Sequence, residues 1–481
     1  MLFTIVSLSV CLATPSHPSD IVFPEYVFTP PVASEFRETV LNDIPVYIVE
    51  DRELPLINVV ATFRGGDYLD SASSVGLTGM MASLIRDGGT SSLSAEDLDE
   101  RLAFLATNCG VRGGQSTVVA SLNCLSSTFE ESFDLFLDML KNPGFQESRV
   151  RLKKDAMVEN MKQRNDYPSS ILKRENKSLL FGDSYLSRNS TIDAVETIDV
   201  DALHKSHGDI VNPSNLILSV SGDFNKEEMM SFLSSKLGGW EHGKRSENPP
   251  DVIYEYLPGV YFVDQDVPQG GVRISTRSFR RGDSRVEAGI VMNYILGGGG
   301  FSSRITQKVR SDEGLAYSAS SRLTNGVWSD GVWSAGFESK SPTVALAAIL
   351  IFDEINSIKT ILVSEEELGL AKSAIIEQFP SAFNSRRETL GVFVSDELTG
   401  RDPEHWVDFR EKISAVTAEN VKQVAIDLLD PKKMVVTVVG NWEDIIGGDA
   451  GGRATMEDVR IVVGGDMVEL PLRNPLTLEA E

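Results

Sequence analysis

Short apolar runs rich in β-branched residues alternate along this chain with segments whose apolar side chains recur at helical spacing. Residues 57–63 (INVVATF) predict a buried strand. In residues 76–86 (GLTGMMASLIR) the apolar side chains fall at i, i+3, i+4, i+7 and i+8, which predicts a helix with one buried face. Ser94 predicts the cap of a further helix, and residues 129–141 predict a helix that ends at Asn142–Pro143. The first half should therefore pack amphipathic helices against strands.

The second half repeats this order of elements. It predicts strands at 272–276 and 332–337 and helices at 287–296 and 343–358. Two short matches share an offset of 218 residues: 180–182 (LFG) with 398–400 (LTG), and 220–223 (VSGD) with 438–441 (VVGN). Together they predict a duplicated unit of about 200–220 residues.

The composition of the remaining segments divides the chain further. Residues 1–34 form an apolar leader followed by a proline-rich arm. Residues 244–256 are expected to be a linker between units at 35–243 and 257–446. Residues 447–481 are expected to be a glycine-rich, loosely attached tail. Residues 1–13 resemble a secretory signal with small residues Cys11 and Ala13, which predicts export to the periplasm or beyond. The first basic residue is Arg37, so a misplaced start or an N-terminal strand in a cytoplasmic protein is the alternative.

Charge and cysteine content narrow the classes of function. The 481 residues carry 70 acidic and 45 basic side chains, a formal charge of −25, which disfavours nucleic acid and anionic membranes as partners. No later apolar run approaches 18 residues, so no integral membrane segment is expected. Three cysteines leave at most one bridge, Cys109–Cys124, and the usual burial of free cysteine favours two unpaired thiols.

Common catalytic patterns are scarce. His204 and His207 are three residues apart, but no carboxylate completes a zinc site with them, so we expect packing or surface histidines. No G-x-S-x-G motif occurs. Residues 297–300 (GGGG) could cradle an anion at a helix start, but they lack the Lys-Ser/Thr of a phosphate loop, which favours a tight backbone turn.

The longest specific motif is residues 296–318, LGGGGFSSRITQKVRSDEGLAYS. It resembles the second half of the pitrilysin/insulinase family of inverted-zincin metallopeptidases, the group of mitochondrial processing peptidase, and the resemblance runs from about Glu35 to Trp442. It implies an α+β fold of two homologous halves, each a mainly antiparallel sheet packed with helices. It also implies that Arg310 holds a substrate carbonyl and Tyr317 donates to the oxyanion. The alternative is that Arg310 pairs with Asp312 or Glu313 and Tyr317 is a packed strand residue.

The family's zinc motif, G-L-x-H-x-x-E-H, is degenerate here. Gly79 and Ser83 replace the histidines, Ala82 replaces the general base, and Asn160, eight residues before Pro168, replaces the third ligand. Glycine and alanine offer no lone pair, and a hydroxyl or an amide is a poor ligand for Zn²⁺. We therefore expect no metal and no cofactor in this chain.

An intact Arg/Tyr pattern beside a degenerate zinc motif leads to one main hypothesis. The chain would be a zinc-less subunit that pairs with a homologue bearing H-x-x-E-H and zinc, and that contributes Arg310 and Tyr317 to peptide hydrolysis. A non-catalytic scaffold or peptide-binding protein is the first alternative. An autonomous protease that uses unrecognised residues is the second.

Overall fold

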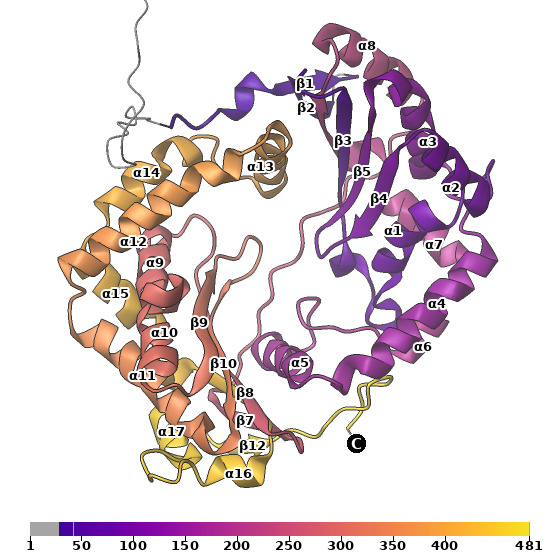
Figure 1. Cartoon of the computed structure of the whole chain (residues 1–481). Helices are drawn as coiled ribbons and strands as arrows, with labels where there is room; N and C mark the ends of the chain where they lie inside the picture. The colour runs from indigo at the N-terminus through magenta and orange to yellow at the C-terminus, as the bar shows by residue number, and fades with distance from the viewer. Residues whose placement is uncertain (1–27, 42, 481) are drawn as a thin grey trace, which may run out of the picture.

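The computed structural model describes residues 28–41 and 43–480. The leader and most of the proline-rich arm lie outside these residues, so their predicted role in export stays a prediction. The chain folds into two halves that lie side by side, each a six-stranded mixed sheet packed with helices (Figure 1). The predicted fold class is confirmed.

The first sheet has the strand order β1-β2-β6-β3-β5-β4. Neighbouring strands are antiparallel except β2 and β6, which run parallel. Phe63 on β3 and Phe133 and Phe136 on α3 are among the fully buried side chains of its core. The strands are β1 (Arg37–Val40), β2 (Ile44–Glu50), β3 (Leu56–Arg64), β4 (Asn108–Gly113), β5 (Thr117–Leu125) and β6 (Leu216–Gly222), and the helices α1 (Leu77–Asp87), α2 (Ala95–Phe104), α3 (Phe129–Lys141), α4 (Glu147–Lys162), α5 (Pro168–Phe181), α6 (Ile192–Glu196), α7 (Val200–Ile210) and α8 (Lys226–Leu237).

The second sheet has the order β12-β7-β11-β8-β10-β9, in which the last five strands repeat the order β2-β6-β3-β5-β4 of the first sheet. Here β7 runs parallel to both β11 and β12, and the other pairs are antiparallel. The edge strand differs, because β12 comes last in its half and is parallel to β7, whereas β1 comes first and is antiparallel to β2. The five equivalent strands confirm the duplication. The strands are β7 (Gly259–Asp264), β8 (Gln269–Arg277), β9 (Ala316–Thr324), β10 (Val332–Lys340), β11 (Val435–Gly440) and β12 (Met467–Glu469), and the helices α9 (Val286–Asn293), α10 (Arg304–Thr306), α11 (Val344–Thr360), α12 (Glu365–Gln378), α13 (Arg386–Thr399), α14 (His405–Ala415), α15 (Ala418–Leu428), α16 (Trp442–Ile446) and α17 (Met456–Val463).

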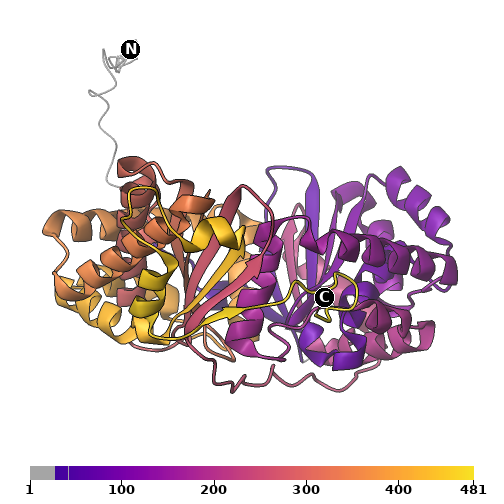
Figure 2. The same cartoon turned by 90° about the horizontal axis from the view of Figure 1, so that it is seen from below.

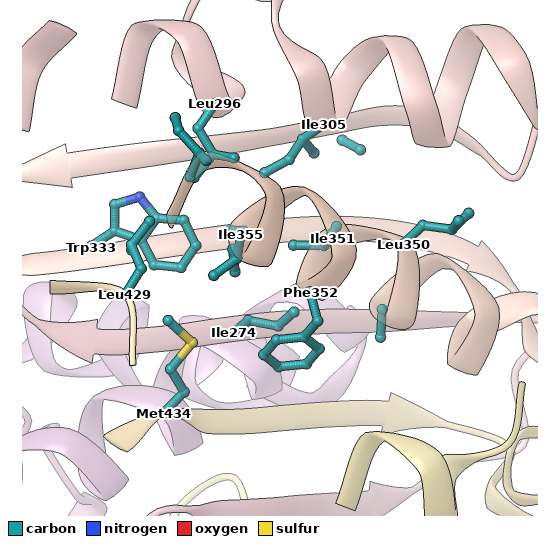
Figure 3. Packing of buried hydrophobic residues seen from close by; sticks show 14 of the residues in the cluster. Ile274, Leu296, Ile305, Trp333, Leu350, Ile351, Phe352, Ile355, Leu429 and Met434 are labelled. Carbon is teal, nitrogen blue, oxygen red and sulfur yellow. The ribbon is translucent and has the colours of Figure 1, made fainter. Parts of the chain in front are cut away.

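The core of the second half surrounds the apolar helix α11. Figure 3 shows Ile351, Phe352 and Ile355 of α11 packed near Ile274 of β8 and Trp333 of β10. Within the described residues, Ser341–Thr360 is the one helical segment long and apolar enough to cross a membrane. Most apolar side chains of α11 are buried in this core, so it is a core helix of the fold.

The two halves exchange a helix. α5 follows the first half's strands in sequence but packs on β8 and β11 of the second sheet, where Leu172 meets Val439. α13 does the reverse and packs on β2 and β6 of the first sheet (Figure 1). Its Phe393 packs with Tyr47 of β2 and Ile217 of β6. The bounds of the predicted units at 35–243 and 257–446 stay a prediction, and each sheet is covered by a helix from the other unit.

The final segment is not the loosely attached tail that its glycine content predicts. Met456, Val459 and Val463 of α17 are buried in the second core, and β12 pairs with β7. The chain then crosses to the first half, where the amide of Ile192 donates to the carbonyl of Leu476 (2.9 Å) (Figure 2). The sequence did not predict these contacts, because glycines divide the segment into stretches with too few apolar residues to show a period.

The segment between the halves has no helix or strand from Trp240 to Pro258, as expected for the predicted linker. It nevertheless contacts both halves. The amide of Ser246 donates to Asn215 Oδ1 (2.7 Å), and that of Val252 to Ser329 Oγ (3.0 Å). These bonds fix its path along the molecule.

Candidate functional site

Arg310 lies on a π-helical turn, Gln307–Asp312, which leads into strand β9. Its guanidinium carbon is 4.6 Å from the ring centre of Phe301 and 4.8 Å from that of Tyr317. Both rings are largely in solvent, with exposed fractions of 68% for Phe301 and 86% for Tyr317. The structure thus brings the two predicted residues together, and it adds Phe301, which the sequence analysis did not single out. We call Phe301, Arg310 and Tyr317 the aromatic–arginine cluster.

The local alternative for this pair does not match the geometry. Within the described residues, Arg310 has neither an ion pair nor a hydrogen-bond partner, and Glu313 pairs with Arg453 instead (2.8 Å). Tyr317 is exposed and not packed. The N–H groups of Arg310 and the hydroxyl of Tyr317 are therefore available to a ligand.

Strand β9 forms the edge of the second sheet, next to β10. An edge strand presents unpaired backbone groups to which another extended chain can bind. The glycine-rich segment lets the preceding helix end approach this strand closely, because a Cβ on Gly297 would lie 2.5 Å from Ser321 Oγ. Arg304, of the same motif, forms a two-point ion pair with Glu367 (2.7 and 2.9 Å) and fixes the following turn.

The degenerate zinc positions lie on α1 and α4. Ala82 is buried, and the hydroxyl of Ser83 donates to Asp87 Oδ2 (3.0 Å). Asn160 is exposed on α4 and does not line the cavity that Gly79 borders. Two of the four positions carry no donor atom, and the other two do not converge on Gly79. This donor set does not fit Zn²⁺.

The predicted packing role of the two histidines agrees with their contacts. His207 is buried, and its Nε2 lies 2.8 Å from the carbonyl oxygen of Leu140. His204 packs edge-on against Phe145. No group of three His, Cys, Asp or Glu side chains suited to a metal occurs among the described residues. Cys109 and Cys124 are free and buried, and burial raises the pKa of the Cys109 thiol to about 12.

One family model matches the middle of the chain. Residues 197–375, which include the aromatic–arginine cluster, match the family described as "Peptidase M16 inactive domain". The match covers less than half of the chain and includes residues 296–318. It confirms the resemblance that these residues carry.

Relatives and solved structures agree with that assignment. The M16 homologue is 24% identical over 353 residues to "Non-peptidase homolog YmxG" of Helicobacter pylori, covering 70% of this chain and 78% of the relative. Its fold matches a peptidase M16 inactive domain from Pseudomonas fluorescens (TM-score 0.76, 20% identity, 84% of this chain and 97% of that one). It also matches the periplasmic protease PqqL from Escherichia coli (TM-score 0.70, 16% identity), covering 87% of this chain and 48% of that one.

Proposed function

We propose that this M16 homologue is a zinc-less subunit that pairs with an active, zinc-bearing homologue and holds the peptide that the partner cleaves. The observation that carries the proposal is the aromatic–arginine cluster, in which a half-buried arginine, without an ion pair or hydrogen bond among the described residues, lies against two exposed rings. A guanidinium held in this way can donate to a backbone carbonyl of a bound peptide.

The division of work between the subunits follows from the chemistry present. A zinc ion in the partner would supply the activated water, which this chain would not provide because its own donor set does not fit Zn²⁺. The Tyr317 hydroxyl donates to the oxygen on which negative charge develops during water attack, and Arg310 fixes the neighbouring carbonyl. The β9 edge adds the peptide as a further strand, so the scissile bond is presented in an extended conformation.

Two of the comparisons support pairing. The Helicobacter pylori relative is named a non-peptidase homologue. The chain accounts for only 48% of the Escherichia coli periplasmic protease, so one chain corresponds to about half of that protein and a second chain would correspond to the rest.

The test is hydrolysis of a fluorogenic peptide by this chain reconstituted with an H-x-x-E-H homologue from the same cells. Tyr317→Phe should lower kcat/KM by about 10²–10³, the usual effect of losing a donor to a developing oxyanion. Arg310→Ala should lower it by about 10–100-fold, the effect of losing a hydrogen bond from a charged group to the substrate carbonyl. Arg387→Ala is the control, because Arg387 is an exposed arginine of α13, outside both the cluster and the β9 edge. Unchanged hydrolysis with Arg310→Ala would show that the proposal is wrong.

The second candidate function is a non-catalytic scaffold, which the name of the Helicobacter pylori relative also favours. Affinity purification of the chain from its native cells separates the two. A near-equimolar H-x-x-E-H homologue supports the peptidase pair. Recovery with unrelated proteins and no such homologue supports the scaffold.

A further inference from the structure

A cavity of about 540 Å³ lies where the lost zinc motif of α1 faces α4 and α5. Its wall carries four cationic side chains and two carboxylates: Lys153, Arg164, Lys177, Arg188, Asp67 and Asp70. This is a local excess of positive charge in a chain whose formal charge is −25.

Three of these charged groups are already engaged in holding the cavity wall. Arg164 donates to Ser190 Oγ (3.1 Å) and to the carbonyl of Pro475 (3.2 Å), and Arg188 pairs with Asp183. Asp70 is buried and accepts from the amides of Gly76 (3.0 Å) and Thr78 (3.1 Å), where it caps the start of α1.

The two lysines are different. Lys153 on α4 and Lys177 on α5 line the cavity, and in the described part of the chain neither ammonium has a hydrogen-bond or ion-pair partner. The side chain of Lys177 reaches solvent, and partial desolvation together with the nearby charges of Lys173 and Arg273 lowers its pKa. The Nε of Arg273 is itself buried without a hydrogen-bond partner. Among the described residues, neither Lys153 nor Lys177 is therefore paired with a carboxylate.

The rest of the cavity offers space and an apolar surface. A Cβ on Gly79 would meet nothing within 4 Å, so the room that the family's first histidine would occupy is open. Met80 and Met157 line the same space. The cavity thus combines an apolar wall with two unpaired ammonium groups.

We propose that this cavity binds the carboxylate of a peptide, either its C-terminus or an acidic side chain, between Lys153 and Lys177. Asp67 also lines the cavity and offsets one of the two lysine charges, so one further negative charge, as on a carboxylate, would balance the set. The peptide nature of the ligand rests on the function proposed above, whereas the anion site rests on the cavity alone.

The test uses the full chain and three labelled apolar heptapeptides, with binding followed by fluorescence anisotropy. One ends in a free carboxylate, one is its C-terminal amide, and one is the amide with an internal glutamate. A charge-assisted contact should make the free acid, the glutamate peptide or both bind about tenfold more tightly than the plain amide. Which of the two does so identifies the source of the carboxylate.

Variants locate the site. The double variant Lys153→Met/Lys177→Met should abolish the preference for carboxylate. Lys173→Met should retain it, because Lys173 is an exposed lysine that lies on α5 with Lys177 but does not line the cavity. Gly79→Leu should also abolish this preference, because the leucine fills the cavity without changing a charge. This variant tests the proposal even if the double variant does not fold.

Equal binding of all three peptides, or a preference that survives both the double variant and Gly79→Leu, would overturn the proposal. The readout is independent of hydrolysis. If Arg310→Ala leaves the pair's activity unchanged while the lysine-dependent preference persists, the peptidase role fails and the anion site stands.

Discussion

The stacking of Arg310 between two rings holds its side chain at the surface without occupying its N–H groups. An ion pair would fix the side chain but would neutralise it and use those donors. Cation–π contacts at exposed sites contribute about 0.5–1 kcal/mol each, enough to favour one orientation. Phe301, which belongs to no predicted site, is therefore a positioning residue for Arg310.

Replacing Phe301 tests this role. Phe301→Ala should raise the KM of the reconstituted pair about two- to fivefold, the equivalent of one cation–π contact, with kcat little changed. Phe301→Tyr should restore KM, because it keeps the ring. A fall in kcat as large as that of Arg310→Ala would contradict a positioning role.

A second residue-scale prediction concerns the stability of the protein at acidic pH. Burial and the cations Arg401 and Lys412 lower the pKa of His405 to about 4. Between about pH 6.5 and pH 4 the unfolded chain therefore binds more protons at His405 than the folded chain does. The free energy of unfolding falls as the pH falls through that range, and below pH 4 His405 causes no further decrease. His405→Gln should make the free energy of unfolding, measured in urea, less dependent on pH in that range, and an unchanged pH dependence would contradict this role of His405.

The sequence identifies some of these residues and not others, for a physical reason. Arg310 and Tyr317 are seven residues apart in one motif, so local spacing reveals them. The importance of Lys153 and Lys177 depends on which of the 45 basic side chains lack a partner, and that is decided by residues distant in the chain.

At the scale of elements, the exchanged helices carry much of the contact between the halves. Phe393 of α13 has an exposed fraction of 2%, and its ring centre lies 5.7 Å from that of Phe36 and 6.2 Å from that of Tyr47. The two residues it stacks on belong to the first half, so this side chain joins segments far apart in the sequence.

Phe393→Ala should lower the free energy of unfolding by about 3–5 kcal/mol, the usual cost of removing a buried ring. Chemical denaturation followed by tryptophan fluorescence measures it. Phe104→Ala is the control, because that ring is 80% exposed and its loss should cost about 0.5 kcal/mol or less. Equal effects of the two changes would mean that α13 does not stabilise the first sheet.

The exchange of helices could not be predicted from the pattern of apolar residues alone. The 218-residue offset relates 180–182 at the end of α5 to 398–400 at the end of α13, so the sequence shows that the two helices are equivalent. Apolar spacing indicates that a face is buried, but it does not indicate which sheet buries it.

At the scale of the whole molecule, the C-terminal segment ties the second half to the first. Arg473 donates to Glu175 Oε2 (3.1 Å), a carboxylate almost fully buried on α5 that also pairs with Arg174 (2.8 Å). Leu476 packs against the first core. The segment therefore crosses from the second half to the first and joins the two (Figure 2).

Arg473→Ala should lower the free energy of unfolding by about 1–3 kcal/mol, because it removes one of the two cations that satisfy a buried carboxylate. Thermal melts and limited proteolysis after residue 465 report the loss. Arg460→Ala, which removes a surface pair with Glu457, should cost about 1 kcal/mol or less. A larger effect of Arg460→Ala than of Arg473→Ala would contradict the stabilising role of the Arg473–Glu175 contact.

The exchange of α5 and α13 has a mechanical consequence. Moving the two halves apart would expose an apolar face of both sheets at once. We therefore expect the two halves to move as one rigid body, without a hinge between them. If the proposed function holds, a peptide would be enclosed only when a second subunit packs over this one. For the same reason a gene cut at the linker would encode two pieces, neither of which carries a complete core, and only their joint expression would restore the protein.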